Sequence, residues 1–190
     1  MEDNGMIEIL SGTNRPNCNA LRIAQLLLEA YQKLGVEASI LNLQELPAEI
    51  FEPASYASKP ATFLPFQQRV LHASGLHVVT PEYNGGFPGV LKLFIDMLAF
   101  PESFEGRPVA FTGEAAGLWG ALRPVEQLQL IFGYRNAFVF PERVFIAGVH
   151  HKFDEAGHFN DPELLQRLQG QAAGFTRFVN RLADSGGIPS

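Results

Sequence analysis

Short apolar runs alternate along the chain with segments whose apolar residues recur at helical spacing. Runs of strand length occupy residues 6–10, 36–43, 76–80, 107–112 and 136–140, and a further extended piece follows at 143–147. Helical spacing predicts helices over residues 21–34, 66–73, 90–98, 121–132 and 162–182. Asp161 is placed to cap the last helix, with Pro162 at its first position. Strands that alternate with helices predict an α/β fold with a parallel sheet.

Five strands and five helices predict a single doubly wound domain over residues 1–190, with strand order 2-1-3-4-5 and helices on both faces. In that order the chain reverses direction between strands one and three. The loops that follow those strands, residues 12–19 and 81–89, should therefore meet at one crevice. Residues 44–65 contain four prolines and predict an irregular connection.

The composition narrows the class of protein. A chain of 190 residues with 46% hydrophobic and 18% charged residues suits one globular domain. The net charge of −6, without a basic cluster, argues against nucleic acid as a partner. A single cysteine excludes an internal disulfide framework and a multi-cysteine metal site. No apolar run is long enough to cross a membrane, and the acidic start at residues 1–5 lacks the basic region of a signal peptide, so we expect a cytoplasmic protein without a membrane partner.

The stretch Thr80-Pro81-Glu82-Tyr83-Asn84-Gly85-Gly86-Phe87-Pro88-Gly89 lies where a predicted strand ends and a helix begins. Its prolines fix the backbone and its glycines remove side-chain bulk, so a flat ligand can approach backbone N–H groups closely. Asn84-Gly85 predicts a tight turn, with at least one residue of 84–86 at positive φ. A strict turn without any ligand explains the same residues.

Residues 12–19, Gly-Thr-Asn-Arg-Pro-Asn-Cys-Asn, form a polar loop directly before a helix. Free N–H groups at the helix start, together with Arg15 and the polar side chains of the loop, favour an anion. The loop matches neither Gly-x-Gly-x-x-Gly nor a P-loop, so a monophosphate suits it better than a dinucleotide or a triphosphate. The alternative is a capping loop with Asn17 or Asn19 as the helix cap.

The central stretch resembles the Pro-Glu-Tyr-Asn-Gly-(Ser/Gly)-x-Pro-Gly-x-Leu-Lys segment of the NAD(P)H-dependent FMN reductase family, whose fold is flavodoxin-like. The positions in register are Pro81, Glu82, Tyr83, Asn84, Gly85, Pro88, Gly89, Leu91, Lys92 and Asp96. Residues 12–20 look like the family's phosphate loop, and residues 113–123 resemble its third flavin-side loop, in which Gly117, Gly120, Leu122 and Arg123 match.

The resemblance implies FMN as the cofactor and NADPH or NADH as co-substrate. It assigns the FMN phosphate to Thr13, Arg15, Asn19 and the Cys18 position, and the flavin ring to a set of loop residues: Pro81, Glu82, Tyr83, Asn84, Gly85, Gly113 and Gly117. Backbone N–H groups of Glu82–Asn84 and near Gly117 would stabilise charge on the ring. Cys18 replaces the usual serine and Ala20 replaces a common hydroxyl residue, which weakens two phosphate contacts because a thiol is a poor donor.

The resemblance further implies an FMN-dependent NAD(P)H oxidoreductase that works by a ping-pong mechanism. Its acceptor would be a small molecule: a free flavin, a quinone, an azo compound or a metal oxyanion. The side chains would have no catalytic acid–base role, Glu82 included. The resemblance and the apolar residues at 87–100 favour a homodimer or homotetramer.

Four other interpretations stay open. Two of these interpretations retain the flavodoxin-like fold: an electron-carrying flavodoxin, and a flavodoxin-like binding protein that has lost FMN. The third is a metal site built from His150, His151, Asp154, Glu155 and His158, although their spacing matches no standard zinc pattern. The fourth makes Cys18 a nucleophile activated by the helix start.

Overall fold

The computed structural model describes residues 6–186, so the acidic start at residues 1–5 and most of the predicted C-terminal tail lie outside it. Five strands form the sheet: β1 (Ile7–Ser11), β2 (Ala38–Asn42), β3 (Gly75–Pro81), β4 (Pro108–Ala115) and β5 (Phe138–Ala147). Five α-helices surround it: α1 (Asn19–Lys33), α2 (Leu64–His72), α3 (Gly89–Met97), α4 (Leu122–Tyr134) and α5 (Pro162–Asp184). Short 3₁₀ helices complete the chain: η1 (Leu43–Glu45), η2 (Ala48–Phe51), η3 (Pro53–Tyr56), η4 (Ala61–Phe63) and η5 (Val149–His151).

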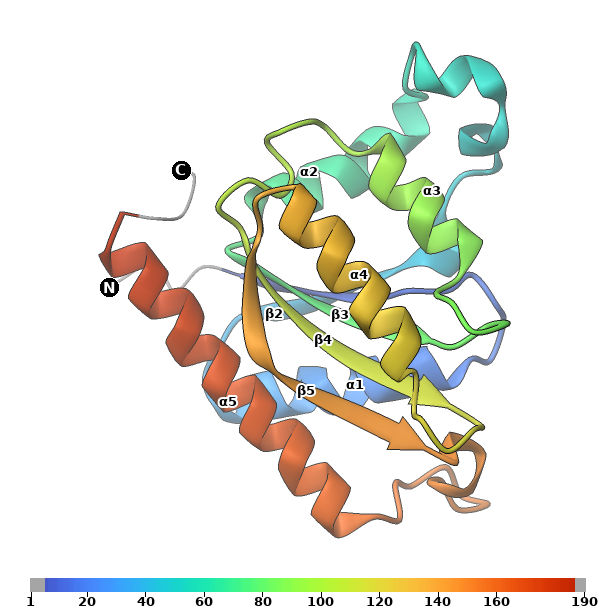
Figure 1. The fold of residues 1–190 in the computed structure, drawn as a ribbon, viewed down its shortest axis with the longest axis vertical. Coiled ribbons are helices and arrows are strands. Elements are labelled where there is room, and N and C mark those ends of the chain that lie inside the picture. Colours follow the sequence, from blue (N-terminus) through green and yellow to red (C-terminus); the bar gives the residue numbers. More distant parts are fainter. Residues whose placement is uncertain (1–5, 187–190) are drawn as a thin grey trace.

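All strand pairs are parallel and their order is β2-β1-β3-β4-β5, which confirms the predicted doubly wound topology. Helices α1 and α5 cover one face of the sheet, and α2, α3 and α4 cover the other (Figure 1). Each face has its own apolar core, because the buried strands send alternate side chains to opposite faces. The Asp161 side chain caps α5 as predicted, accepting a hydrogen bond from the N–H of Leu164 at 3.0 Å.

The last strand differs from its prediction. The two extended pieces at 136–140 and 143–147 are one strand, β5, with an irregularity between them. Val109 of β4 pairs with Val139, whereas Phe111 pairs with Arg143, so the intervening residues of β5 bulge out of the ladder. Pro141 lies in this bulge, where its missing N–H removes no ladder hydrogen bond.

The apolar stretch at 87–100 is also packed differently from its prediction. Most of its large side chains are buried within this one chain, and among them only Phe100 is largely exposed. The predicted irregular connection forms η1–η4 and covers a second side of α3. Phe63 at the end of η4 makes an edge-to-face contact with Phe94 of α3, with ring centroids 6.0 Å apart. Burial within the single chain therefore accounts for most apolar residues on more than one side of α3.

A series of hydrogen bonds between buried polar side chains connects α1, β3, β4 and α5. The Tyr31 hydroxyl lies 2.7 Å from Nδ1 of His77, and Nε2 of His77 lies 2.9 Å from the Thr112 hydroxyl. Thr112 donates to Oε1 of Gln171 at 2.8 Å, and Nε2 of Gln171 donates to the carbonyl oxygens of Phe111 and Glu142. Burial lowers the pKa of His77 to about 3, so its imidazole is neutral at physiological pH.

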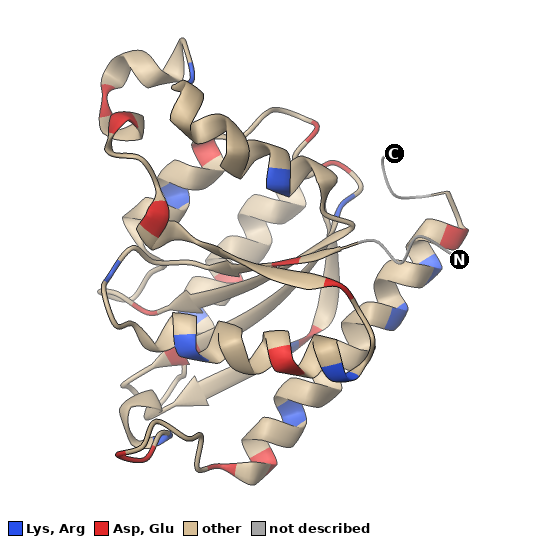
Figure 2. Cartoon of the chain, turned by 180° about the vertical axis from the view of Figure 1, so that it is seen from behind, with Lys and Arg blue, Asp and Glu red and all other residues tan. Residues whose placement is uncertain are grey.

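Acidic and basic residues are interspersed along the ribbon in Figure 2. In the described part of the chain, no helix has both the length and the hydropathy needed to cross a membrane.

Candidate functional site: a crevice at the carboxyl ends of the strands

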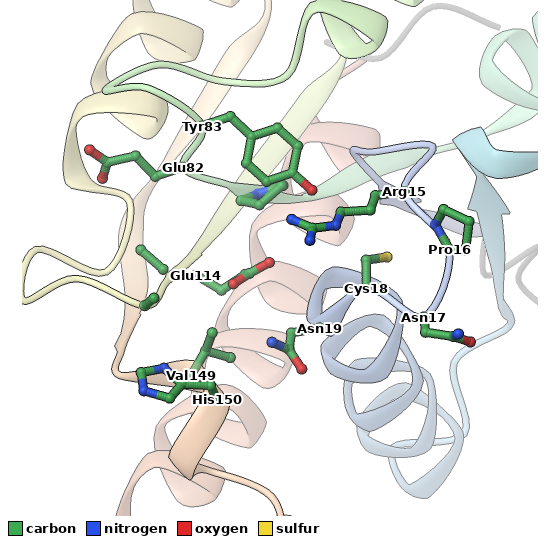
Figure 3. A pocket seen from close by; sticks show the side chains of 13 residues that line it. Arg15, Pro16, Asn17, Cys18, Asn19, Glu82, Tyr83, Glu114, Val149 and His150 are labelled. Carbon is green, nitrogen blue, oxygen red and sulfur yellow. The ribbon is translucent and has the colours of Figure 1, made fainter.

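A cavity of about 380 Å³ opens where β1, β3, β4 and β5 end (Figure 3). Its walls come from four connections. Residues 15–19 follow β1, residues 81–83 end β3, residues 114–116 end β4, and Val149 with His150 belongs to η5. The crevice predicted between the loops after strands one and three therefore exists, and β4 and η5 extend it.

The turn after β3 has the backbone that its sequence predicts. Tyr83 and Gly86 pair through two hydrogen bonds of 2.8 and 3.1 Å, which leaves Asn84 and Gly85 as a two-residue loop. Their φ values are 53° and 78°, the signature of a type I′ turn. The expected positive φ is thus confirmed. The N–H groups of Glu82 and Tyr83 donate to the backbone of Glu114 and Gly86, so these two are already used within the protein.

Tyr83 ties this turn to the loop after β1. Its hydroxyl lies 3.1 Å from Oγ1 of Thr13, which also accepts a hydrogen bond from the N–H of Arg15 at 3.3 Å. Thr13 is fully buried and is not among the residues that line the cavity. Its hydroxyl therefore holds the two loops together.

The loop after β1 leads into α1, and no side chain caps the first N–H groups of this helix. Cys18, not Asn17 or Asn19, is the N-cap residue, and its side chain makes no capping hydrogen bond. Cys18 and Asn19 line the cavity, so the start of α1, with its uncapped N–H groups, lies at the cavity wall. Arg15 is exposed above them and has no ion pair within residues 6–186 (Figure 3). Helix donors and an available guanidinium make this wall suited to an anion.

Replacing Cys18 by serine should stabilise the fold, because a serine hydroxyl at the N-cap accepts a hydrogen bond from the helix start that the thiol does not make. We expect a gain of about 0.5–1 kcal/mol in the free energy of unfolding, measured by urea denaturation. Affinity for FMN should stay equal or rise, because a hydroxyl is the stronger donor. A large loss of FMN affinity in Cys18→Ser would contradict the anion-binding assignment of this loop.

The connection after β4 meets the turn after β3 through two side chains of α4. Arg123 lies 3.2 Å from a carboxylate oxygen of Glu82, and Gln127 donates to the carbonyl of Gly85 at 3.5 Å.

The ladder between β3 and β4 extends as far as Pro81 and Glu114, so β4 is longer than predicted. Gly113 is consequently a strand residue, and a Cβ there would lie 2.7 Å from the carbonyl oxygen of Gly120.

The structure divides the predicted site residues into two groups. Six line the cavity: Arg15, Cys18, Asn19, Pro81, Glu82 and Tyr83. Five lie outside its wall: Thr13, Asn84, Gly85, Gly113 and Gly117. Of the second group, Thr13 and Gly113 shape the loops, and the other three lie in the connections after β3 and β4.

Among the cavity residues that were not predicted for this site, two are titratable. Glu114 projects into the cavity from the end of β4, and His150 borders it from η5 (Figure 3). Glu114 is only 5% exposed, and burial raises its pKa to about 7, against the opposing effect of the Arg15 charge. An acidic residue two positions after the predicted strand at 107–112 was the one sequence signal for it.

The metal interpretation finds no support in this arrangement. Within residues 6–186, no three histidine, cysteine, aspartate or glutamate side chains are grouped to hold an ion. Asp154 and His158 pair with each other at 3.3 Å, whereas His150 faces the cavity.

Comparison with known proteins identifies relatives over most of the chain. The family model of NADPH-dependent FMN reductase matches residues 6–152. A quinone reductase of Escherichia coli K12 is 27% identical over 183 residues, which cover 93% of this chain and 96% of that protein. An NAD(P)H-dependent FMN reductase of Pseudomonas aeruginosa is 33% identical over 153 residues, 78% of this chain and 81% of that protein.

Among solved structures, the flavoenzyme NAD(P)H:(acceptor) oxidoreductase FerB of Paracoccus denitrificans superposes with a TM-score of 0.78 at 22% identity. The match covers 93% of this chain and 98% of FerB, and it supports the flavodoxin-like fold. The family match includes all four connections that line the cavity. The chain therefore belongs to the NADPH-dependent FMN reductase family.

Proposed function

We propose that this protein is an FMN-dependent NAD(P)H oxidoreductase that passes electrons to a quinone, a flavin or a similar small acceptor. The observation that carries the proposal is the anion-binding wall of the cavity. There the uncapped start of α1 and the guanidinium of Arg15 flank one crevice, in a chain of this family. A phosphate monoester matches that donor set, because helix N–H groups and arginine both favour a doubly charged anion.

The residues present fit FMN. Arg15, Asn19 and the first N–H groups of α1 would hold its phosphate. Pro81, Glu82 and Tyr83 would border its ring, and the turn residues Asn84 and Gly85 would offer it their N–H groups. When bound, FMN accepts a hydride from NAD(P)H and delivers two electrons to a second acceptor. The protein would bind and orient these groups through the rigid type I′ turn and the Thr13–Tyr83 contact.

We further propose a ping-pong order. The cavity lies at the carboxyl ends of the strands, and the nicotinamide and the second acceptor would occupy it in turn. Relatives named quinone reductase and NAD(P)H-dependent FMN reductase support the choice of acceptor class.

An absorption spectrum of the purified protein, taken before and after NADPH, tests this function. We expect the bands of bound flavin, and their bleaching by NADPH followed by recovery when a quinone is added. Flavin bands that NADPH does not bleach would favour the electron-carrying flavodoxin. A protein that binds no added FMN would favour the interpretation of a binding protein that has lost the cofactor.

We also propose that the protein self-associates. Most large apolar side chains of residues 87–100 are buried. Large apolar side chains are exposed on and before α4 instead, namely Leu118, Trp119, Leu130 and Tyr134. Leu130 and Tyr134 are one helical turn apart and 77% and 82% exposed, so they share one face. Light scattering at micromolar concentration should give the mass of at least two chains, and a monomer alone would contradict the proposal.

A further inference from the structure

Glu114 stands apart among the residues of the cavity because it is a buried acid that faces the ligand space. It pairs with Pro81 in the ladder between β3 and β4, and its carbonyl oxygen accepts the N–H of Glu82 at 3.1 Å. The backbone is thereby fixed by the sheet. The side chain points from the strand end into the cavity, toward the loop that carries Arg15 (Figure 3).

A second buried acid, Glu8, shows how this fold neutralises a carboxylate that serves structure alone. Glu8 is 0% exposed and receives two hydrogen bonds from Arg69, at 2.7 and 3.0 Å, and one from Ser39 at 2.8 Å. The Glu114 carboxylate has no hydrogen bond or ion pair of this kind within residues 6–186. Ionising a buried acid that has no hydrogen-bond or ion-pair partner is costly. We therefore expect Glu114, which faces a ligand cavity, to have a functional role.

The charged and titratable groups around Glu114 come from three connections. Arg15 and Cys18 face the cavity from the loop after β1, Glu82 and Tyr83 from the end of β3, and His150 from η5. Glu82 is paired with Arg123 of α4 and contributes little net charge. Arg15 is therefore the cation that favours ionisation of Glu114, and it is also the cation best placed for an anionic ligand.

These two demands on Arg15 compete. We propose that Glu114 is the proton-binding residue of this cavity, taking up one proton from solvent when an anionic ligand engages Arg15. An anion on Arg15 removes the counter-charge of the Glu114 carboxylate and adds a negative charge beside it, and both effects favour the protonated acid. The balance is one proton gained by the carboxylate and none exchanged with the ligand. With FMN as that ligand, the inference rests on the proposed function.

The sign of the pH dependence follows from linkage. Burial raises the pKa of Glu114 to about 7, so above that pH the ligand-free protein carries an ionised Glu114. Binding must then import a proton, and FMN affinity falls as the pH rises, by up to about tenfold per pH unit. Below about pH 7 the acid is already protonated, so Glu114 adds no pH dependence there.

Proton uptake can be counted by calorimetry of the ligand-free protein titrated with FMN near pH 8, in two buffers of different ionisation enthalpy. At that pH the phosphate is doubly charged throughout, since its second pKa is about 6. We expect an uptake of at least about half a proton for the wild type and close to zero for Glu114→Gln. The glutamine variant should also bind FMN several-fold more tightly near pH 8 and lose the pH slope. His150→Gln is the matched control, and it should keep the wild-type uptake.

Equal uptake in wild type and Glu114→Gln, or its loss in His150→Gln alone, would overturn the inference while leaving FMN binding intact. Absence of FMN binding would instead overturn the proposed function. A carbon NMR titration of the Glu114 carboxyl in the ligand-free protein tests the inference without any ligand. A midpoint near pH 7 supports the inference, and an ordinary midpoint near pH 4.5 refutes it. Circular dichroism of each variant verifies that it is folded.

Discussion

Replacing Gly120 by alanine is expected to lower the free energy of unfolding by about 2–5 kcal/mol. Gly120 has a φ of +55°, and an added Cβ would lie 2.9 Å from the backbone nitrogen of Ile146 and 3.0 Å from that of Ala147. Left-handed backbone is unfavourable for a residue with a side chain, and the atoms in the way belong to β5 and cannot rotate aside. For a chain of this length, a fall of roughly 10 °C in the midpoint of thermal unfolding should accompany the change.

Gly117 provides a control three residues away in the same connection. A Cβ at Gly117 would meet no atom within 4 Å, and its φ is not in the left-handed region. Gly117→Ala should therefore change the free energy of unfolding by no more than roughly 0.5 kcal/mol. Equal stability of the two variants would show that the close approach of this connection to β5 is not maintained in solution.

The largest effect on binding is expected from Arg15. Arg15→Ala should raise the dissociation constant of FMN by roughly 10- to 100-fold, because a hydrogen bond to a charged group contributes about 1.5–3 kcal/mol. The Arg15 side chain is exposed and is not part of either apolar core, so the melting temperature should stay near that of the wild type. Quenching of flavin fluorescence during titration measures the constant. Arg15→Lys should be intermediate, because lysine keeps the charge but not the planar pair of donors.

Arg181→Ala removes the same charge from the last turn of α5, at the end of the molecule away from the cavity (Figure 1). We expect the FMN dissociation constant of this variant to match the wild type. If Arg15→Ala behaves like Arg181→Ala, then Arg15 does not hold the phosphate.

The sequence predicted the topology because the strands and helices have distinct periods and proline or glycine separates them. It also predicted the Asn84-Gly85 turn, since that dipeptide adopts the type I′ backbone readily. Element ends were less predictable. Gly113 and Glu114 look like loop residues, yet they continue β4, because their ladder partners Thr80 and Pro81 continue β3. A strand's length is set by its neighbour, which lies about thirty residues away in the sequence.

Burial by distant segments explains the remaining differences. The apolar residues of α3 led to the prediction of a partner surface. Their spacing does not indicate that η1–η4 cover the helix. Likewise, the environment of Glu114 depends on Arg15 and on η5, which reach it only in the folded chain. The wall of a cavity is assembled from separate connections, so residue type alone identified Arg15 but not Glu114.

The buried hydrogen bonds from Tyr31 to Gln171 fix which nitrogen of His77 carries hydrogen. Two carbonyl groups, those of Phe111 and Glu142, fix the orientation of the Gln171 amide, because only its NH₂ can donate to them. Its oxygen then faces Thr112, whose hydroxyl must donate, so His77 carries its hydrogen on Nε2 and accepts the phenol hydrogen of Tyr31 on Nδ1. The main chain of β4 and β5 thus selects a single imidazole tautomer at the centre of the sheet. The nitrogen chemical shifts of that ring should display this tautomer unchanged through the pH range in which surface histidines titrate.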